Sequence, residues 1–208
     1  MPERIVIPSS FAEYEANFRR PVLAMLALDR VTVVQRIFDS WEPWKLTLNN
    51  VEVKSDGNLA EQAITFKLSE KGIALILTAV GFRFTKENAT WSAAEETQAI
   101  LHAAKTAVMD ATNMELTSQA FTIALHFQPT TKRNTLVLAP LFTDHLSQVF
   151  ASEPTVYATS VRWKDRLVSI DGSAVYANGI FLRLSHTFDG FASLEQILER
   201  GFDQSATG

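Results

Sequence analysis

The sequence contains no cysteine among its 208 residues. This absence excludes disulfide bonds, thiolate metal ligands and cysteine nucleophiles, and it leaves the redox compartment open. Long apolar runs are lacking too, because the longest (22–28 and 73–80) fall far short of the ~20 residues that a membrane span needs. The N-terminal MPERIVIP has neither the basic region nor the apolar length of a signal peptide. We therefore expect a cytoplasmic protein that makes no membrane contact.

An excess of positive charge is also missing. The chain carries 19 Lys and Arg against 23 Asp and Glu, a net charge of −4. Nucleic-acid binding usually needs a basic field, so this balance disfavours it unless a local patch compensates. Apolar residues, by contrast, make up 47% of the chain and include 14 Phe, which indicates a globular protein with an aromatic core.

Apolar patterns with periods of two and of 3.6 residues follow one another along the chain and predict an α+β fold. Gln62–Ser69 and Gln119–Phe127 alternate as half-buried strands do. Thr90–Asn113 is the clearest helix, with alanines on one face and a capping box at its start, from Ser92 to Glu95. A short amphipathic helix is predicted within an N-terminal arm, residues 1–20.

A short stretch of sequence occurs twice. QRIFDSWEP at 35–43 returns as SQVFASEP at 147–154, each time between a helical pattern and a run of strands. The segments 21–112 and 113–208 both read strand, helix, three-strand meander, helix. This predicts a mainly antiparallel sheet packed by helices, in two tandem βαβββα units within one domain, with Phe38 and Phe150 at equivalent buried positions. Coincidence is the alternative, because the local similarity is short.

The four histidines are the natural candidates for chemistry. No two of them have the i, i+2 or i, i+4 spacing of a metal pair, so neither a metal nor a cofactor is predicted. His126 lies on the polar face of its strand and His145 on the apolar side of a helix. They are weak candidates for a general base, and the favoured interpretation is open solvent for His126 and the edge of the core for His145. We expect His186 to lead into a turn.

Three further side chains are weak candidates for ligand binding: Arg83 and Arg183 for an anion, and Trp163 for an aromatic contact. Arg162, Trp163 and Lys164 interleave cation and ring, as proteins that bind single-stranded nucleic acid do. The end of an exposed hairpin has the same composition, and the acidic total favours that interpretation. No phosphate-binding loop, dinucleotide fingerprint or nucleophile elbow occurs in the sequence.

The leading hypothesis for function is a non-catalytic binding or protein-interaction module, with a protein or a small molecule as its partner and a homodimer as its expected state. It depends on the absence of a reactive constellation, and on Trp41, Trp44 and Trp163 near the ends of elements, where an interface can use them. The alternative is an enzyme whose pocket is assembled from dispersed His, Arg and acidic residues. Nucleic-acid binding through the hairpin at 162–166 comes third.

Overall fold

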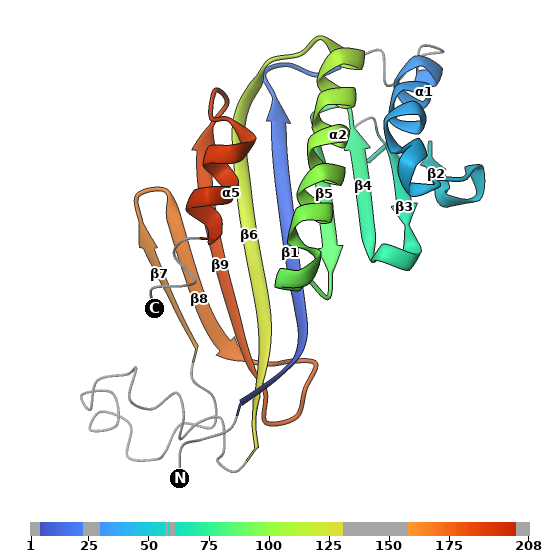
Figure 1. Ribbon diagram of the computed structural model, residues 1–208. Helices are drawn as coiled ribbons and strands as arrows, with labels where there is room; N and C mark the ends of the chain where they lie inside the picture. Colours follow the sequence, from blue (N-terminus) through green and yellow to red (C-terminus); the bar gives the residue numbers. More distant parts are fainter. Residues whose placement is uncertain (1–4, 23–29, 57, 59–60, 131–157, 203–208) are drawn as a thin grey trace. The chain divides into compact units, whose positions relative to one another are not determined.

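The computed structural model describes residues 5–22, 30–56, 58, 61–130 and 158–202. They form an antiparallel nine-stranded sheet with three helices (Figure 1), so the predicted α+β class is confirmed. The strand order is β2-β3-β4-β5-β1-β6-β9-β8-β7. The strands are β1 (Ile5–Phe18), β2 (Val51–Lys54), β3 (Ala63–Leu68), β4 (Ile73–Thr78), β5 (Gly81–Glu87), β6 (Leu116–Pro129), β7 (Thr159–Trp163), β8 (Arg166–Gly172) and β9 (Ile180–Asp189). The helices are α1 (Arg30–Trp41), α2 (Ala94–Thr112) and α5 (Leu194–Phe202).

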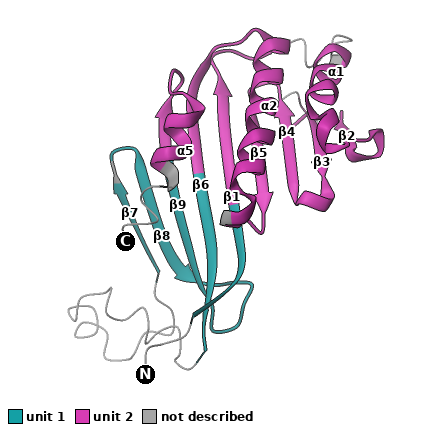
Figure 2. Cartoon of the chain, in the orientation of Figure 1, with its two compact units in different colours: residues 1–11, 122–186 teal, residues 12–121, 187–208 magenta. Residues whose placement is uncertain are grey.

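The chain divides into two compact units (Figure 2). Unit 1 comprises residues 1–11 and 122–186, and unit 2 comprises residues 12–121 and 187–208. The strands β1, β6 and β9 contribute residues to both units, whereas all three described helices belong to unit 2. None of the helices in the described segments is long and apolar enough to cross a membrane.

The core of unit 2 lies between the sheet and the helices, which cover one face of it (Figure 1). Every second residue of β3 and of β4 is buried, and the alternating sequence predicted this for β3. Ala104 of α2 is fully buried, and its small side chain allows the helix to approach its neighbours closely. Trp41 of α1 is also fully buried, and its Nε1 donates to the carbonyl oxygen of Ile100 at 3.3 Å. The expectation that Trp41 serves an interface is therefore wrong.

The predicted N-terminal helix is wrong, because its residues belong to strand β1. Tyr14, Ala16 and Phe18 are buried and alternate with half-buried neighbours, which is the period of a strand. In the sequence this alternation is obscured by the small Ala16. Phe11, Tyr14 and Phe18 also have the spacing of one helical face, and that spacing suggested the wrong element.

The helix α1 forms where it was predicted but buries a different face. An apolar stripe in the sequence, made of Val31, Val34, Phe38 and Trp41, predicted the buried face. The structure buries Val33, Ile37 and Trp41 at i, i+4 and i+8, and Val31 is 69% exposed. Phe38 is half-buried. Two apolar stripes lie side by side on this helix, and periodicity alone does not show which of them the rest of the protein covers.

The predicted duplication stays a prediction. Reading the sheet from its two ends gives β3-β4-β5-β1 on one side, after β2, and β7-β8-β9-β6 on the other. In the first series, β1 lies beside β5, the last strand of the meander β3-β4-β5 that follows it in the chain. In the second series, β6 lies in the same way beside β9, the last strand of β7-β8-β9. This order is consistent with a repeat, but Phe150 lies outside the described residues, so its comparison with Phe38 is not made. The compact units also cut the chain elsewhere than at residue 113.

Candidate functional site

The sequence candidates that the structure describes are divided between the two units. Arg83 belongs to unit 2, whereas His126 and Arg183 belong to unit 1. His145 and the side chain of Trp163 lie outside the described part of the structure. In the described residues, no group of three or more His, Cys, Asp or Glu side chains could hold a metal ion.

Arg83 faces two carboxylates rather than an empty site. Its Nε lies 3.5 Å from Oε2 of Glu13, and its Nη2 lies 3.8 Å from Oε2 of Glu15. The three side chains come from β5 and β1, which are neighbours in the sheet. Because two anions already balance the guanidinium charge, this arrangement disfavours the expected role of Arg83 in binding an anionic ligand.

His126 is half-buried and lies against a loop, not in the open solvent that the sequence suggested. Its Nδ1 is 2.8 Å from the hydroxyl oxygen of Ser173. That oxygen also accepts the backbone N–H groups of Val175 at 3.2 Å and Tyr176 at 3.0 Å. With its two lone pairs occupied, the Ser173 hydroxyl has its proton left to donate to Nδ1 when that nitrogen carries none.

Aromatic rings complete the surroundings of His126. The ring centroids of Tyr176 and Phe181 lie 5.3 and 5.0 Å from that of the imidazole. Gln128, further along β6, donates from Nε2 to the carbonyl oxygen of Ala177 at 3.0 Å. The 173–179 loop is therefore tied to β6 at two points. Sequence reasoning missed this cluster because its partners lie far along the chain.

A histidine–aspartate pair, also missed from the sequence, occurs in unit 1. His186 lies within β9 and is only 4% exposed, so the expectation that it leads into a turn is wrong. Its Nε2 is 2.5 Å from Oδ2 of Asp165, which precedes β8 in the β7–β8 turn. This hydrogen bond is the main reason why the pKa of the Asp165 carboxyl is lowered. The ring is buried and the carboxylate is exposed, so the pair holds the turn against β9.

A buried glutamine forms the centre of a polar network in unit 2. The side-chain Oε1 of Gln119 accepts from the Tyr14 hydroxyl at 2.5 Å and from Nζ of Lys105 at 2.9 Å. Its Nε2 donates to the carbonyl oxygens of Asp189 at 3.0 Å and Ala192 at 2.9 Å. Burial raises the pKa of Tyr14 and lowers that of Lys105. Every polar atom of the glutamine side chain is satisfied, and the network connects β1, α2, β6 and the turn before α5.

The sheet of unit 2 has a second face, opposite the helices, which we call the open face. Cross-strand pairs place Glu52, Thr65, Ile76 and Arg83 in one row across β2 to β5. An exposed ion pair of 2.6 Å between Lys67 and Glu52 lies on the same face. Its members are mostly small, hydroxyl or charged side chains, and they are Glu13, Glu15, Asn17, Glu52, Lys54, Ala63, Thr65, Lys67, Ala74, Ile76, Thr78, Arg83, Thr85, Glu87 and Ser118.

Comparison with known protein families finds no family whose model matches this sequence, and comparison with curated proteins finds none that is significantly similar.

Proposed function

We propose that this protein is a non-catalytic binding module that recognises a partner protein through the open face of unit 2. The observation that carries the proposal is the contrast between the two faces of this sheet. One face packs its large apolar side chains under three helices, while the other presents small side chains that are only half-buried, such as Thr65, Ala74 and Thr85. Among the described residues, no helix covers that second face.

The chemistry of the open face suits a protein partner better than a nucleic acid. Carboxylates of Glu13, Glu15 and Glu52 stand among its cations, and phosphate groups would be repelled by them. Interfaces between proteins commonly combine such mixed charges with small and hydroxyl side chains. A homo-oligomer and a cytoplasmic location, both expected from the sequence, belong to the same proposal and remain predictions.

Site-specific photocrosslinking tests the proposal. A benzoylphenylalanine placed at Thr85 on the open face should give a covalent adduct of one defined mass in cells that produce the protein. The same group at His102, exposed on α2, should give no such adduct. Thr65→Arg adds bulk to the open face and should abolish the adduct formed from position 85, whereas Thr106→Arg on α2 should not. Equal crosslinking from both faces would contradict the proposal.

A second function, hydrolysis through Ser173, is favoured by one observation. The Ser173 hydroxyl is placed to donate to Nδ1 of His126, which is the arrangement that a serine nucleophile and its base require. The same oxygen, however, already accepts two backbone N–H groups, and these occupy the lone pairs that would attack a substrate. We therefore rank this function below binding.

Labelling with a fluorophosphonate separates the two functions. A nucleophilic Ser173 would displace fluoride from the probe, and the modification would disappear in Ser173→Ala and in His126→Ala. On the binding proposal the wild type stays unlabelled. Labelling that maps to Ser173 and needs His126 would overturn our ranking.

A further inference from the structure

The turn between β9 and α5 presents the most exposed large apolar side chain described in the protein. Phe191 is 90% exposed. A side chain this exposed contributes almost nothing to the core, and its apolar surface remains in water unless another molecule covers it. Single exposed apolar residues are common on protein surfaces, so Phe191 alone would carry no inference.

The turn that carries Phe191 is held rigidly. Asp189 accepts the backbone N–H of Phe191 on Oδ1 at 2.8 Å. The buried amide of Gln119 binds the carbonyl oxygens on both sides of the turn, those of Asp189 and Ala192. Gly190 lies against β6 so closely that a Cβ there would be 1.9 Å from the carbonyl oxygen of Leu116. The phenyl ring is thus attached to an ordered turn, and binding it costs little conformational entropy.

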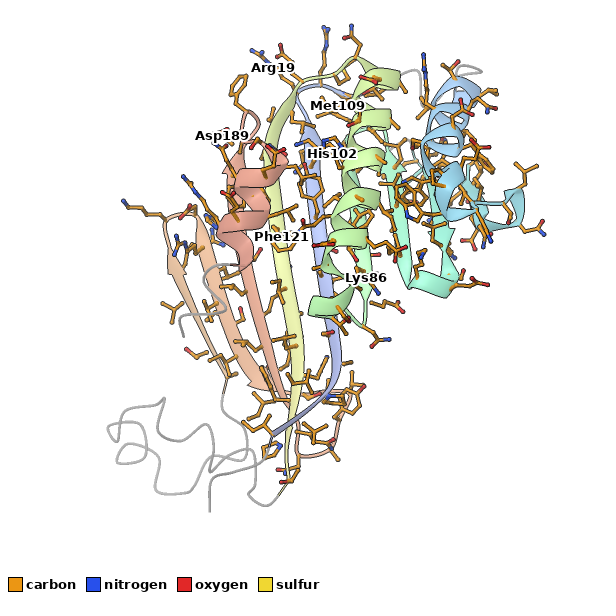
Figure 3. The ribbon with its side chains drawn as sticks, in the orientation of Figure 1. Arg19, Lys86, His102, Met109, Phe121 and Asp189 are labelled. Carbon is orange, nitrogen blue, oxygen red and sulfur yellow. The ribbon has the colours of Figure 1, made fainter. Side chains whose placement is uncertain are left out.

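An ion pair flanks the turn. Leu116, which touches Gly190, directly follows Glu115 in the chain. Oε2 of Glu115 is 2.6 Å from Nη1 of Arg19, and these side chains are 65% and 68% exposed. Figure 3 labels Arg19 and Asp189 at the same end of the sheet of unit 2. One ordered aromatic side chain, one cation and one anion therefore share a small surface, which we call the Phe191 end.

We infer that the Phe191 end is the contact between two copies of this chain. The argument is self-complementarity: a two-fold axis brings the same patch of both copies together. The Arg19–Glu115 pair within each copy then lies beside that of the other copy, with Arg19 of one against Glu115 of the other. The two Phe191 rings cover each other at the axis. A nucleic acid or an anionic membrane would gain nothing from this patch, because its charges cancel.

This inference extends the part of the proposed function that concerns self-association, and it names the surface. The Phe191 end consists of three exposed side chains, whereas a standard interface uses about 20–30 residues on each side. The dimer should therefore be weak and should form in the micromolar range of concentration. Partner binding through the open face does not depend on it.

Sedimentation velocity over a series of protein concentrations tests the inference. The wild type should shift from monomer to dimer as concentration rises, and Phe191→Ala should raise the dissociation constant at least about tenfold. Arg19→Glu gives both copies two acidic groups at the contact, and Glu115→Arg gives both two basic groups. Neither variant should associate with itself. An equimolar mixture of the two should form heterodimers, because opposite charges then meet across the axis.

Two controls keep the result interpretable. Glu96→Lys breaks an ion pair of the same length, between α2 and Lys71 before β4, and should leave association unchanged. Thermal melts should be similar for all variants, since exposed ion pairs contribute little to stability. Dimers that survive Phe191→Ala and both charge reversals would place self-association elsewhere and overturn this inference alone. A wild type that stays monomeric at every concentration would also refute the expected homodimer.

Discussion

Gln119 uses its whole side-chain amide inside unit 2. It accepts from Tyr14 and Lys105 and donates to two carbonyl oxygens of the turn before α5. Gln119→Leu should leave those carbonyl oxygens and the Tyr14 hydroxyl without their partner in a buried place. We expect the free energy of unfolding to fall by about 3 kcal/mol, measured by urea denaturation.

Gln128 provides the matched control for Gln119. It is a glutamine of the same strand, but its amide donates one bond at an exposed site, to the carbonyl oxygen of Ala177. Gln128→Leu should cost less than about 1 kcal/mol, because water can replace the lost partner. Equal losses in the two variants would show that the buried network is not what stabilises the turn.

The pair of Asp165 and His186 makes a prediction about pH. The hydrogen bond from His186 lowers the pKa of Asp165 below its ordinary 3.8. Because the pKa is lower in the folded state, the ionised carboxylate stabilises the fold at pH values above its ordinary pKa. This stabilisation is lost as the pH falls through the pKa of the folded state. Wild type should therefore be more stable than Asp165→Asn near neutral pH, and the difference should shrink below about pH 3.8.

Unfolding in urea at several pH values gives that comparison. Asp110→Asn, at an exposed position of α2, serves as the control for the loss of one carboxylate. If Asp165→Asn differs from wild type by the same amount at pH 3 and at pH 7, the carboxylate is not what holds the β7–β8 turn.

At the scale of one element, the buried face of α2 combines the large Ile100 and Leu101 with small side chains such as Ala104 and Ala107. Ala104 is fully buried, as the alanine pattern predicted. Ala104→Leu should overpack this contact and lower the free energy of unfolding by roughly 1–3 kcal/mol. His102→Leu, two residues earlier on the exposed side of the helix, should stay within about 0.5 kcal/mol of wild type. The thermal melting temperatures of the two variants measure the difference.

The starts of α2 and α5 differ in their caps. Ser193 and Gln196 satisfy each other's backbone N–H groups at 3.2 and 3.1 Å, which is a capping box. The box predicted from Ser92 does not form, since α2 begins after Ala93 without a side-chain cap. Ser193→Ala should lower the free energy of unfolding by about 1 kcal/mol, while Ser92→Ala should leave it nearly unchanged. Chemical denaturation measures the free energy of unfolding of both variants. Similar losses in the two would refute the assignment of the caps.

The sequence predicted an element correctly where its apolar residues follow a single spacing, every second residue in a strand or one face of a helix. The strand β3 and the helix α2 were found because every second residue, or one helical face, is apolar. The strand β1 was missed because the small Ala16 weakens its alternation. The candidate contacts were harder: the Tyr14–Gln119 bond joins residues 105 positions apart, and His186 meets Asp165 across 21 positions. Such pairings depend on strand register, which a local pattern does not contain.

At the scale of the whole molecule, the described core is unevenly distributed. Nearly all of the described buried side chains belong to unit 2, among them Phe66, Leu75 and Ile100. In unit 1, the β7–β8 hairpin has side chains that are half-buried or exposed wherever they are described. Local opening costs least where few buried contacts must be broken. The two units should therefore open with different free energies, although β1, β6 and β9 run through both.

Native-state hydrogen exchange measures this difference amide by amide. The amides of β4 and α2 should exchange only through global unfolding, so that their protection follows the urea-dependent free energy of unfolding of the whole protein. Those of β7 and β8 should exchange faster and with little dependence on urea, because opening the hairpin exposes little new surface. Phe66→Ala should weaken protection in β4 and α2 by its full cost, about 3–5 kcal/mol, and should leave the fast amides of the hairpin unchanged. Equal protection throughout would mean that the molecule unfolds as one cooperative body.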